Sequence, residues 1–505
     1  MRSLIITFVF YLSITVISGP ASSQEQLTYE LLDSYIQSAA DDFEMPGLAV
    51  GVVKDGEVVF LRGYGFSNTV TKKKVDENTL FAIASCSKAF TAACLAMLVD
   101  EGKISWEDRV VDLYPGFQLF DPYITRELMV RDLLSHRAGY ETFDGDLLWY
   151  GTDYSREEVL RRFRHRKNEY SLREKYGYSN IMFIAAGEVI HAVTGMTWDE
   201  FVTERIFLPL GMDNSTTTNR GFEEMANVAW PHLDGQPMSF INYDNSGPAA
   251  SINTSASELL MWISLMLNKG TWNDSVVFTE AQYYNLVSPN TITRQGKAET
   301  VDGTHFYTYG LGWAMKDYDG RKIIDHGGGL PGFHSKVVFV PEENLGYVIL
   351  ANEISALVPA LEHDLLDFHL NDSLGWVAKY LPYKNMQEQR EAARWEQMEQ
   401  ERVKDTRPSL PLESYTGTYE DEMYGKAEIR MSGNMLEVQL IPTGELFTAP
   451  MEHWHYDTFR IRVNDPFLPA GLITFALDEA GNVEGFRINI ENPDFLFYKL
   501  DFRKL

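Results

Sequence analysis

Cysteine is scarce in this chain: its 505 residues include two, Cys86 and Cys94. If both lie on one helix they are about 12 Å apart, at ~1.5 Å per residue, whereas a disulfide needs Cα atoms within ~7 Å of each other. The sequence therefore predicts two buried thiols rather than a disulfide framework. A hydrophobic core must stabilise the fold, and 45% hydrophobic residues are sufficient for one.

Positive charge is also scarce, because 44 Lys and Arg face 72 Asp and Glu, which gives a net charge of −28. A protein that binds nucleic acid needs a basic face to neutralise phosphates, so the balance argues against nucleic acid as a partner. An acidic surface keeps a protein soluble. It also permits weak association with Ca²⁺ or with an extracellular matrix.

Long apolar runs are absent after the N-terminus. Residues 4–17 are apolar, Arg2 precedes them, and the small residues at 21–23 suit cleavage, which predicts a secretory signal peptide over 1–23. The run is too short for a typical membrane span, so we expect a secreted, extracellular protein that is not bound to a membrane. Such a chain can carry glycans at four Asn-x-Ser/Thr sequences: Asn214, Asn253, Asn273 and Asn371.

The order of β-prone and helical segments predicts the architecture of residues 24–384. Two hairpins are expected, at 48–65 and 309–326, each around an Asp-Gly turn, and two more strands at 334–341 and 345–352. Helices are expected between them, including 85–102 and 181–195. An antiparallel sheet built from both ends of this segment and flanked by helices satisfies the order, which is an α/β fold of the α+β type.

The composition changes after residue 384. Residues 385–408 are charged, Gln-rich and helix-favouring, which predicts a solvated connector. Six short β-prone runs follow, the first at 426–431 and the last at 495–500. Their spacing predicts an all-β barrel or sandwich over 409–505.

A hydroxyl and an amine open the most apolar internal helix, 81-FAIASCSKAFTAACLAML-98. In the first helical turn, Ser85 would lie beside unpaired N–H groups that favour a developing oxyanion. Lys88 projects from the same face, and burial would lower its pKa until it can accept the serine proton. A capping serine and a surface lysine are the structural alternative, but Ser-x-x-Lys occurs once in the chain and an unused lysine in this helix is costly.

This stretch, with 128-LMVRDLLSHRAGY-140, resembles the nucleophile region of serine β-lactamase-like hydrolases of the class C and D-Ala-D-Ala carboxypeptidase type, peptidase S12. The resemblance runs from about residue 45 to 352. It implies a transpeptidase-like sheet flanked by helices, two further motifs, and neither a metal nor an organic cofactor. The C-terminal region resembles the lipocalin-like domain that some members carry.

The second motif of that family is Tyr-x-Asn, and the chain offers it at Tyr178, Tyr243 and Tyr283. Tyr178 fits best, because a short loop precedes it and a helix follows; Tyr243 is held in reserve. The resemblance implies that Tyr178 exchanges protons, with a pKa lowered by Lys88, and that Asn180 holds a substrate carbonyl.

The third motif is matched by His326-Gly327-Gly328, where glycines let a substrate lie close to the strand. The resemblance places an oxyanion hole at the backbone N–H groups of Ser85 and Gly329. True β-lactamases have lysine and threonine where this chain has His326 and Gly327, so the cation and hydroxyl that grip a substrate carboxylate are missing. If neutral His326 is required, activity should fall below about pH 6 to 7.

Two functions are consistent with these features. One is a secreted serine hydrolase that acts on a small or peptide-like ester or amide through a Ser85 acyl-enzyme. The other is a non-catalytic acidic extracellular protein that keeps the fold, similar to the gigasin-type shell-matrix proteins of animals.

The replaced motif predicts weak or no hydrolysis of β-lactams. We expect nitrocefin to be turned over far more slowly than a simple ester, because nothing in the third motif grips the carboxylate of the β-lactam. Absorbance assays with both substrates measure this ratio. Comparable rates would contradict the prediction.

Overall fold

The computed structural model describes residues 27–293 and 303–505, so the predicted signal peptide lies outside the described residues. A mixed-length antiparallel sheet of nine strands forms the centre of the larger unit. In sheet order its strands are β10 (Thr291–Ile292), β11 (Tyr307–Tyr309), β12 (Ala314–Tyr318), β13 (Arg321–Leu330), β14 (Phe333–Val340), β15 (Leu345–Ala351), β1 (Gly47–Lys54), β2 (Glu57–Asn68) and β3 (Lys73–Lys74).

The two ends of this unit meet in the sheet, as predicted. Strand β1 pairs with β15, with Leu48 opposite Ala351, and both predicted hairpins are present. Their turns carry a positive φ at both central residues, 54° and 84° at Asp55 and Gly56 and 47° and 75° at positions 319 and 320. That geometry matches the twist of the paired strands, which explains why Asp-Gly is found at both turns.

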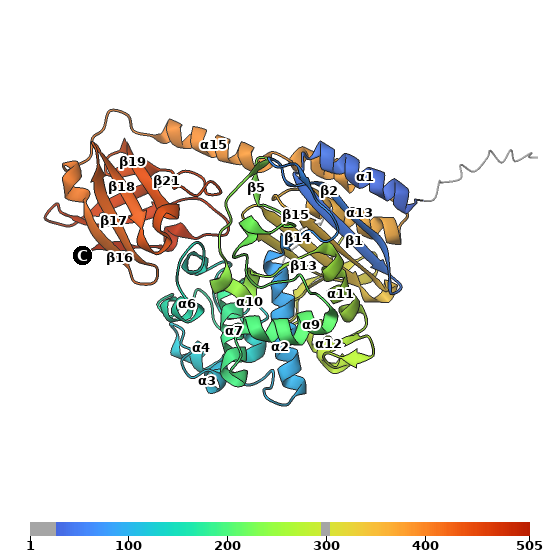
Figure 1. The fold of residues 1–505 in the computed structure, drawn as a ribbon. Coiled ribbons are helices and arrows are strands. Elements are labelled where there is room, and N and C mark those ends of the chain that lie inside the picture. Colours follow the sequence, from blue (N-terminus) through green and yellow to red (C-terminus); the bar gives the residue numbers. More distant parts are fainter. Residues whose placement is uncertain (1–26, 294–302) are drawn as a thin grey trace, which may run out of the picture.

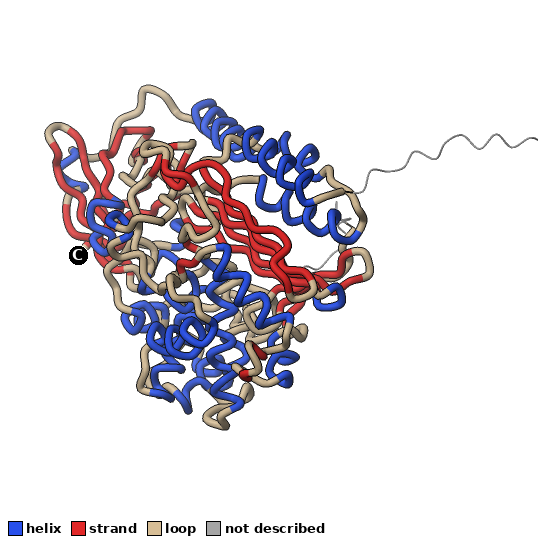
Figure 2. The backbone as a smooth tube through the Cα atoms, turned by 45° about the vertical axis from the view of Figure 1, so that its right-hand side comes forward, coloured by secondary structure: helices blue, strands red, loops and turns tan. Residues whose placement is uncertain are grey.

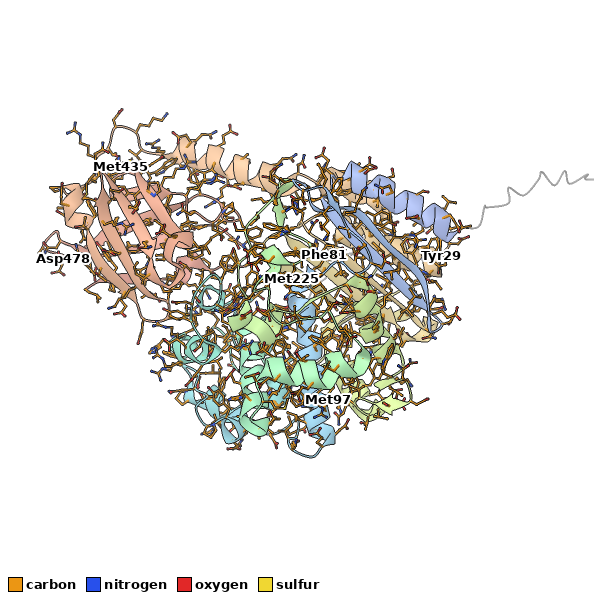
Figure 3. All side chains as sticks on the ribbon, viewed as in Figure 1. Tyr29, Phe81, Met97, Met225, Met435 and Asp478 are labelled. Atoms are coloured by element: carbon orange, nitrogen blue, oxygen red, sulfur yellow. The ribbon has the colours of Figure 1, made fainter. Side chains whose placement is uncertain are left out.

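Helices cover both faces of the sheet (Figures 1 and 2). On the outer face α1 and α13 bury leucines and isoleucines against β1 and β15. Tyr29, labelled in Figure 3, lies at the start of α1, and its ring centroid is 5.4 Å from that of Phe368. On the inner face, α11 lies so close that a Cβ at Gly346 would come within 2.2 Å of Ile263. The helices are α1 (Tyr29–Asp42), α2 (Ser87–Asp100), α3 (Val110–Leu113), α4 (Pro122–Glu127), α5 (Val130–Leu133), α6 (Arg156–Phe163), α7 (Asn180–Thr194), α8 (Trp198–Val202), α9 (Leu208–Leu210), α10 (Gly247–Ala250), α11 (Ala256–Leu267), α12 (Glu280–Leu286), α13 (Leu357–Leu370), α14 (Trp376–Tyr380) and α15 (Met386–Glu401).

The C-terminal unit is a closed barrel of eight strands. Rings of Tyr419, Phe475, Phe486 and Phe502 are buried and contact one another in sequence. The predicted strand at 495–500 is wrong: a 3-10 turn occupies Phe497–Lys499, and the last strand lies at Phe502–Lys504. The strands are β16 (Gly417–Asp421), β17 (Gly425–Ser432), β18 (Met435–Leu440), β19 (Thr448–His455), β20 (Thr458–Ile461), β21 (Gly471–Leu477), β22 (Val483–Asn489) and β23 (Phe502–Lys504).

The connector is helical, as predicted, but α15 also packs against the barrel. Trp395 of this helix meets Trp454 of β19 edge to face at 5.9 Å between ring centroids, and Arg394 pairs with Glu491 at 2.5 Å. Figure 1 shows α15 bridging the barrel and the sheet unit. The connector therefore fixes the barrel from one side.

A second contact fixes the barrel from the other side, beside the helical region. Lys499 lies within 3.2 Å of Glu141, Asp144 and Glu169, and it is nearly buried among them. The hydroxyl of Tyr150 donates a 2.6 Å hydrogen bond to buried Asp465 of the barrel. Loss of the Tyr150 hydroxyl would leave Oδ2 of buried Asp465 without its donor, so this polar contact makes the docking specific.

One predicted glycosylation site is wrong. Asn253 is 3% exposed, lies in β7 (Asn253–Thr254) paired with β4 (Phe81–Ala82), and donates its amide to Ser251, so no glycan fits there. Asn214, Asn273 and Asn371 are exposed. Both cysteines are free and buried, as predicted.

Within the two described ranges no single helix has the length and apolar character to cross a bilayer, although the bent pair formed by α7 and residues 198–210 passes the same test when taken together.

Candidate active site

Ser85 lies in a tight 3-10 turn, Ala84–Cys86, directly before α2. The preceding residue, Ala84, adopts a left-handed φ of 49°, which an alanine takes up only where its surroundings force it. Strand β13 constrains the turn, because Gly328 lies directly against it: a Cβ added at Gly328 would be 2.2 Å from the Ile83 carbonyl oxygen. The turn aims the Ser85 side chain at the sheet edge, while the residues around it are buried.

Lys88 is fully buried, one turn along from Ser85. Its Nζ lies 3.0 Å from Ser85 Oγ, 2.6 Å from Asn180 Oδ1 and 2.9 Å from the Ala249 carbonyl oxygen of α10. Burial lowers the pKa of Lys88 to about 7, as predicted in direction. A neutral amine keeps two N–H donors for Asn180 and Ala249, which leaves its lone pair for the Ser85 hydroxyl.

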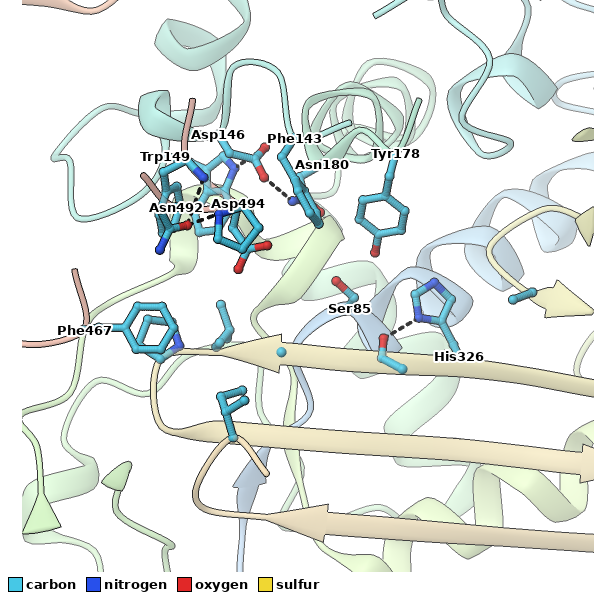
Figure 4. A pocket seen from close by; sticks show the side chains of 18 of the residues that line it. Ser85, Phe143, Asp146, Trp149, Tyr178, Asn180, His326, Phe467, Asn492 and Asp494 are labelled. Carbon is cyan, nitrogen blue, oxygen red and sulfur yellow. Dashed lines mark hydrogen bonds between the residues drawn. The ribbon is translucent and has the colours of Figure 1, made fainter. Parts of the chain in front are cut away.

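Tyr178 ends the loop before α7 and points its hydroxyl toward Ser85 (Figure 4). The Nζ of Lys88 lies 4.7 Å from the centre of the Tyr178 ring. Burial raises the pKa of the Tyr178 phenol well above its ordinary value, which outweighs the lowering by its hydrogen bond with Ser85. The predicted lowering is therefore wrong, because desolvation of a phenolate dominates, and Tyr178 keeps its proton.

Asn180 connects Lys88 to a carboxyl group that was not predicted from the sequence. Its side-chain amide donates to Asp146 Oδ2 at 2.6 Å, and Trp149 Nε1 donates to the other oxygen at 2.9 Å. Burial raises the pKa of Asp146 to about 8. Asp146 thus fixes which way Asn180 faces, so that the amide oxygen is turned to Lys88.

His326 is held as a neutral ring. Its Nδ1 donates to the Gly327 carbonyl oxygen at 2.7 Å, so its Nε2 accepts from the Tyr309 hydroxyl at 2.8 Å. Burial, together with the nearby Lys88, lowers the pKa of His326 to about 3. The assignment of a fall in activity at pH 6 to 7 to protonation of His326 is therefore wrong, since burial holds the pKa of this ring far below that range.

The three glycines of β13 differ in role. Gly327 and Gly329 are exposed and line the cleft, whereas Gly328 faces the serine turn and is absent from the lining. Assigning Gly328 to the substrate is thus wrong: it is a packing position. The pairing of β13 with β12 ends at Asp325, so the edge of residues 326–330 lies open along the cleft.

The cleft has a volume of about 540 Å³ and lies between the sheet edge, the helical region and the barrel. It brings together Ser85, Tyr178, Asn180 and His326, which are scattered along the chain. Tyr243 packs instead against Trp149 and Tyr150, and Tyr283 lies in α12; neither lines the cleft. The lining residues are Ser85, Phe143, Asp146, Trp149, Tyr176, Tyr178, Asn180, Thr293, Tyr309, Ala314, His326, Gly327, Gly329, Leu330, Pro331, Ile354, Phe467, Asn492, Pro493, Asp494 and Phe495.

The barrel supplies part of this wall through Phe467 and the loop 492–495 (Figure 4). This wall is not predictable from the sequence, because most of the loop lies between two predicted strands of the barrel and no local pattern places it beside Ser85. His136 is a second residue without a predicted role: its ring packs at a tilt against Tyr178, with 4.1 Å between centroids, and its Nδ1 accepts from the Ser179 N–H. Among the described residues, no group of three or more His, Cys, Asp or Glu is placed to hold a metal ion.

Comparison with known proteins identifies the larger unit. A family model described as Beta-lactamase matches residues 32–371, two thirds of the chain. The chain belongs to the beta-lactamase family. A second model, described as a domain of unknown function, DUF3471, matches residues 401–504, which contain the barrel.

Named relatives are distant but extensive. The chain is 28% identical over 430 residues to "Unguisins hydrolase ungD'" of Aspergillus campestris, which covers 78% of this chain and 76% of that protein. It is 26% identical over 358 residues to "Protein flp" of Staphylococcus aureus strain MW2, covering 68% and 66%.

Solved structures share the fold. The octameric penicillin-binding protein homologue from Pyrococcus abyssi superposes with a TM-score of 0.59 at 18% identity, over 95% of this chain and 100% of that chain. A structure of SurE gives a TM-score of 0.56 at 17% identity, covering 94% and 98%. Both matches extend over the barrel as well as the family domain.

The packing of Gly328 generates a prediction on stability. Gly328→Ala should lower the free energy of unfolding by about 1–3 kcal/mol, because its methyl group would overlap the Ile83 carbonyl and Ser335 Oγ. Gly327→Ala is the matched control, since the nearest atoms to its Cβ are 3.9 Å away. Chemical denaturation of both variants measures the difference. Equal losses would show that the turn does not rest on Gly328.

Proposed function

We propose that the chain is a secreted serine hydrolase of the peptidase S12 type that cleaves an ester or an amide through an acyl-enzyme on Ser85. The observation that carries this proposal is the 3.0 Å contact between Ser85 Oγ and the Nζ of Lys88, a buried amine whose pKa is lowered to about 7. A serine hydroxyl is a weak nucleophile until a neighbouring base takes its proton. Near neutral pH a substantial fraction of Lys88 is such a base.

In the acylation step, Ser85 Oγ attacks the carbonyl carbon of the substrate as its proton passes to Lys88. The N–H groups of Ser85 and Gly329 stabilise the oxyanion. Collapse of the tetrahedral intermediate breaks the bond to the leaving atom, which takes a proton from the Tyr178 hydroxyl. Lys88 returns a proton to Tyr178, and water then releases the acid from Ser85 with the same groups in reverse roles.

The substrate of this reaction is an ester or a peptide-like amide without a carboxylate at the third motif. Neutral His326 is already engaged by Tyr309 and by its own backbone, so it offers no cation to such a group. Hydrolysis is also supported by relatives whose printed names include "Unguisins hydrolase". Weak β-lactam turnover follows from the same reasoning.

The net charge of −28 favours a second candidate, an acidic extracellular matrix protein that keeps the fold without catalysis. A purely structural protein gains nothing from burying Lys88 beside Ser85, because an unneeded buried amine costs stability. We therefore place hydrolysis first.

Covalent labelling separates the two candidates. A fluorophosphonate probe should form one adduct, at Ser85, which mass spectrometry of the digested protein locates. Ser85→Ala should abolish labelling, and Lys88→Met should slow it at least about 100-fold, the usual contribution of a general base. Ser87→Ala is the control, because Ser87 is buried, does not line the cleft, and has a hydroxyl oxygen that accepts a hydrogen bond from the Ile252 N–H. Folded protein that is not labelled would support the matrix candidate.

The pH dependence of ester hydrolysis identifies the base. Lys88 accepts the serine proton only when neutral, so kcat/KM should fall about tenfold per pH unit below about pH 7. His326, with its pKa near 3, should add no inflection above pH 5. Rates between pH 5 and 9, compared with those of His326→Gln, test this assignment: the inflection near 7 should persist in the variant at a lower rate. Loss of the inflection near pH 7 in His326→Gln would show that His326, and not Lys88, is the group that titrates.

A further inference from the structure

We propose that Asp494, on a loop of the C-terminal barrel, selects substrates that carry a cationic amine near the scissile ester or amide. This inference rests on the proposed hydrolase function and names the chemistry of its substrate. It follows from the charge, the aromatic lining and the fixed position of the barrel loop in the cleft.

Asp494 lies in the lining of the cleft that contains Ser85. In the described part of the chain no Lys, Arg or His forms an ion pair with Asp494, and partial burial raises the pKa of its carboxyl. Asp494 also raises the pKa of Asp146, so the two carboxyl groups share one electrostatic environment. A cation that enters the cleft would favour the ionised form of both carboxyl groups, because it attracts the negative charge of Asp494 and of Asp146.

The remaining described lining favours a cation over an anion. It includes neither lysine nor arginine. Lys88 is close to Ser85 but does not line the cleft, because its Nζ is hydrogen-bonded to Asn180 and to the Ala249 carbonyl oxygen. Rings of Phe143, Trp149, Phe467 and Phe495 also line this cleft. Aromatic faces attract ammonium groups, and a carboxylate beside them supplies the countercharge.

The loop that carries Asp494 is held rigidly, as a recognition element requires. Asn492 Oδ1 accepts hydrogen bonds from the backbone N–H groups of Asp494 and Phe495, at 2.8 and 3.2 Å. The Phe495 ring packs at a tilt against Tyr150, with 4.1 Å between ring centroids. Ion pairs hold the chain on both sides of the loop: Glu491 before it pairs with Arg394 of α15, and Lys499 after it pairs with Glu141 of the family domain.

Asp494 occupies the side of the cleft opposite His326. Figure 4 shows Asp494 beside Asp146 and Trp149 on one side of Ser85, with His326 on the other. A substrate that lies across Ser85 therefore meets a carboxylate at one end and a neutral ring at the other. The amine is recognised at the Asp494 end.

Matched pairs of substrates test this inference by kcat/KM. Alanine p-nitroanilide and its N-acetyl derivative place the amine in the acyl half; acetylcholine and its neutral isostere 3,3-dimethylbutyl acetate place the cation in the leaving half. In at least one pair the cationic member should be preferred about tenfold. Asp494→Asn should reduce that preference to about one, Asp494→Glu should keep most of it, and added salt should weaken it.

Glu479→Gln is the matched control, because it removes an exposed acid of the same barrel that does not line the cleft and does not anchor the loop 492–495. It should leave the preference unchanged. Turnover of neutral substrates with no preference for a cation, or with a preference that survives in Asp494→Asn, would overturn the inference and leave the hydrolase proposal intact.

A binding measurement decides the inference even if no substrate is turned over. Calorimetry with Ser85→Ala protein should show that 2-phenylethylammonium binds at least about fivefold more tightly than 2-phenylethanol, and that Asp494→Asn removes this difference. Affinities that are equal, or that do not depend on Asp494, would overturn the proposal. Loss of labelling at Ser85 in the native protein, by contrast, would contradict the hydrolase function alone.

Discussion

The desolvation of one amine is the constraint on which the candidate site depends. Lys88 lies in a helix that is otherwise apolar, and its Nζ is surrounded by Ser85, Asn180 and the Ala249 carbonyl. Burial of a charged amine is costly, so the protein lowers the cost by making the neutral form accessible. The same adjustment that makes Lys88 tolerable in the core makes it able to accept a proton.

The neighbouring groups follow from that constraint. Asn180 must present its oxygen to Lys88, and Asp146 and Trp149 set its orientation. Tyr178 and His326 are both kept in their neutral forms by burial. Tyr178 and His326 therefore add no charge beside the serine, which leaves the carboxylate of Asp494 as a prominent charge in the cleft lining.

Much of the family domain was predictable because its signals are local. Asp-Gly turns specify the two hairpins, and Ser85 with Lys88 is recognisable because polar residues interrupt an apolar helix. Spacing also favoured Tyr178 over Tyr243 and Tyr283. Local pattern does not report desolvation, which is why the direction of the Tyr178 pKa and the titration range of His326 were wrong.

Contacts between segments that are distant in the sequence could not be predicted either. Gly328 has the same local sequence context as its neighbours, yet it packs on the serine turn, and the buried state of Asn253 depends on its pairing with Phe81–Ala82. The wall contributed by 492–495 depends on how the barrel docks, through Tyr150, Asp465 and Lys499. Such arrangements are properties of the tertiary structure, so periodicity and spacing do not reveal them.

The closure of the sheet has a kinetic consequence. Residue 48 finds its strand partner at residue 351, after the whole helical region has been synthesised. The N-terminal hairpin must then wait, with one edge unpaired, until nearly all of the family domain has emerged, and non-local pairing of this kind slows folding. During that interval the exposed edge of β1 is the segment most open to association with other chains.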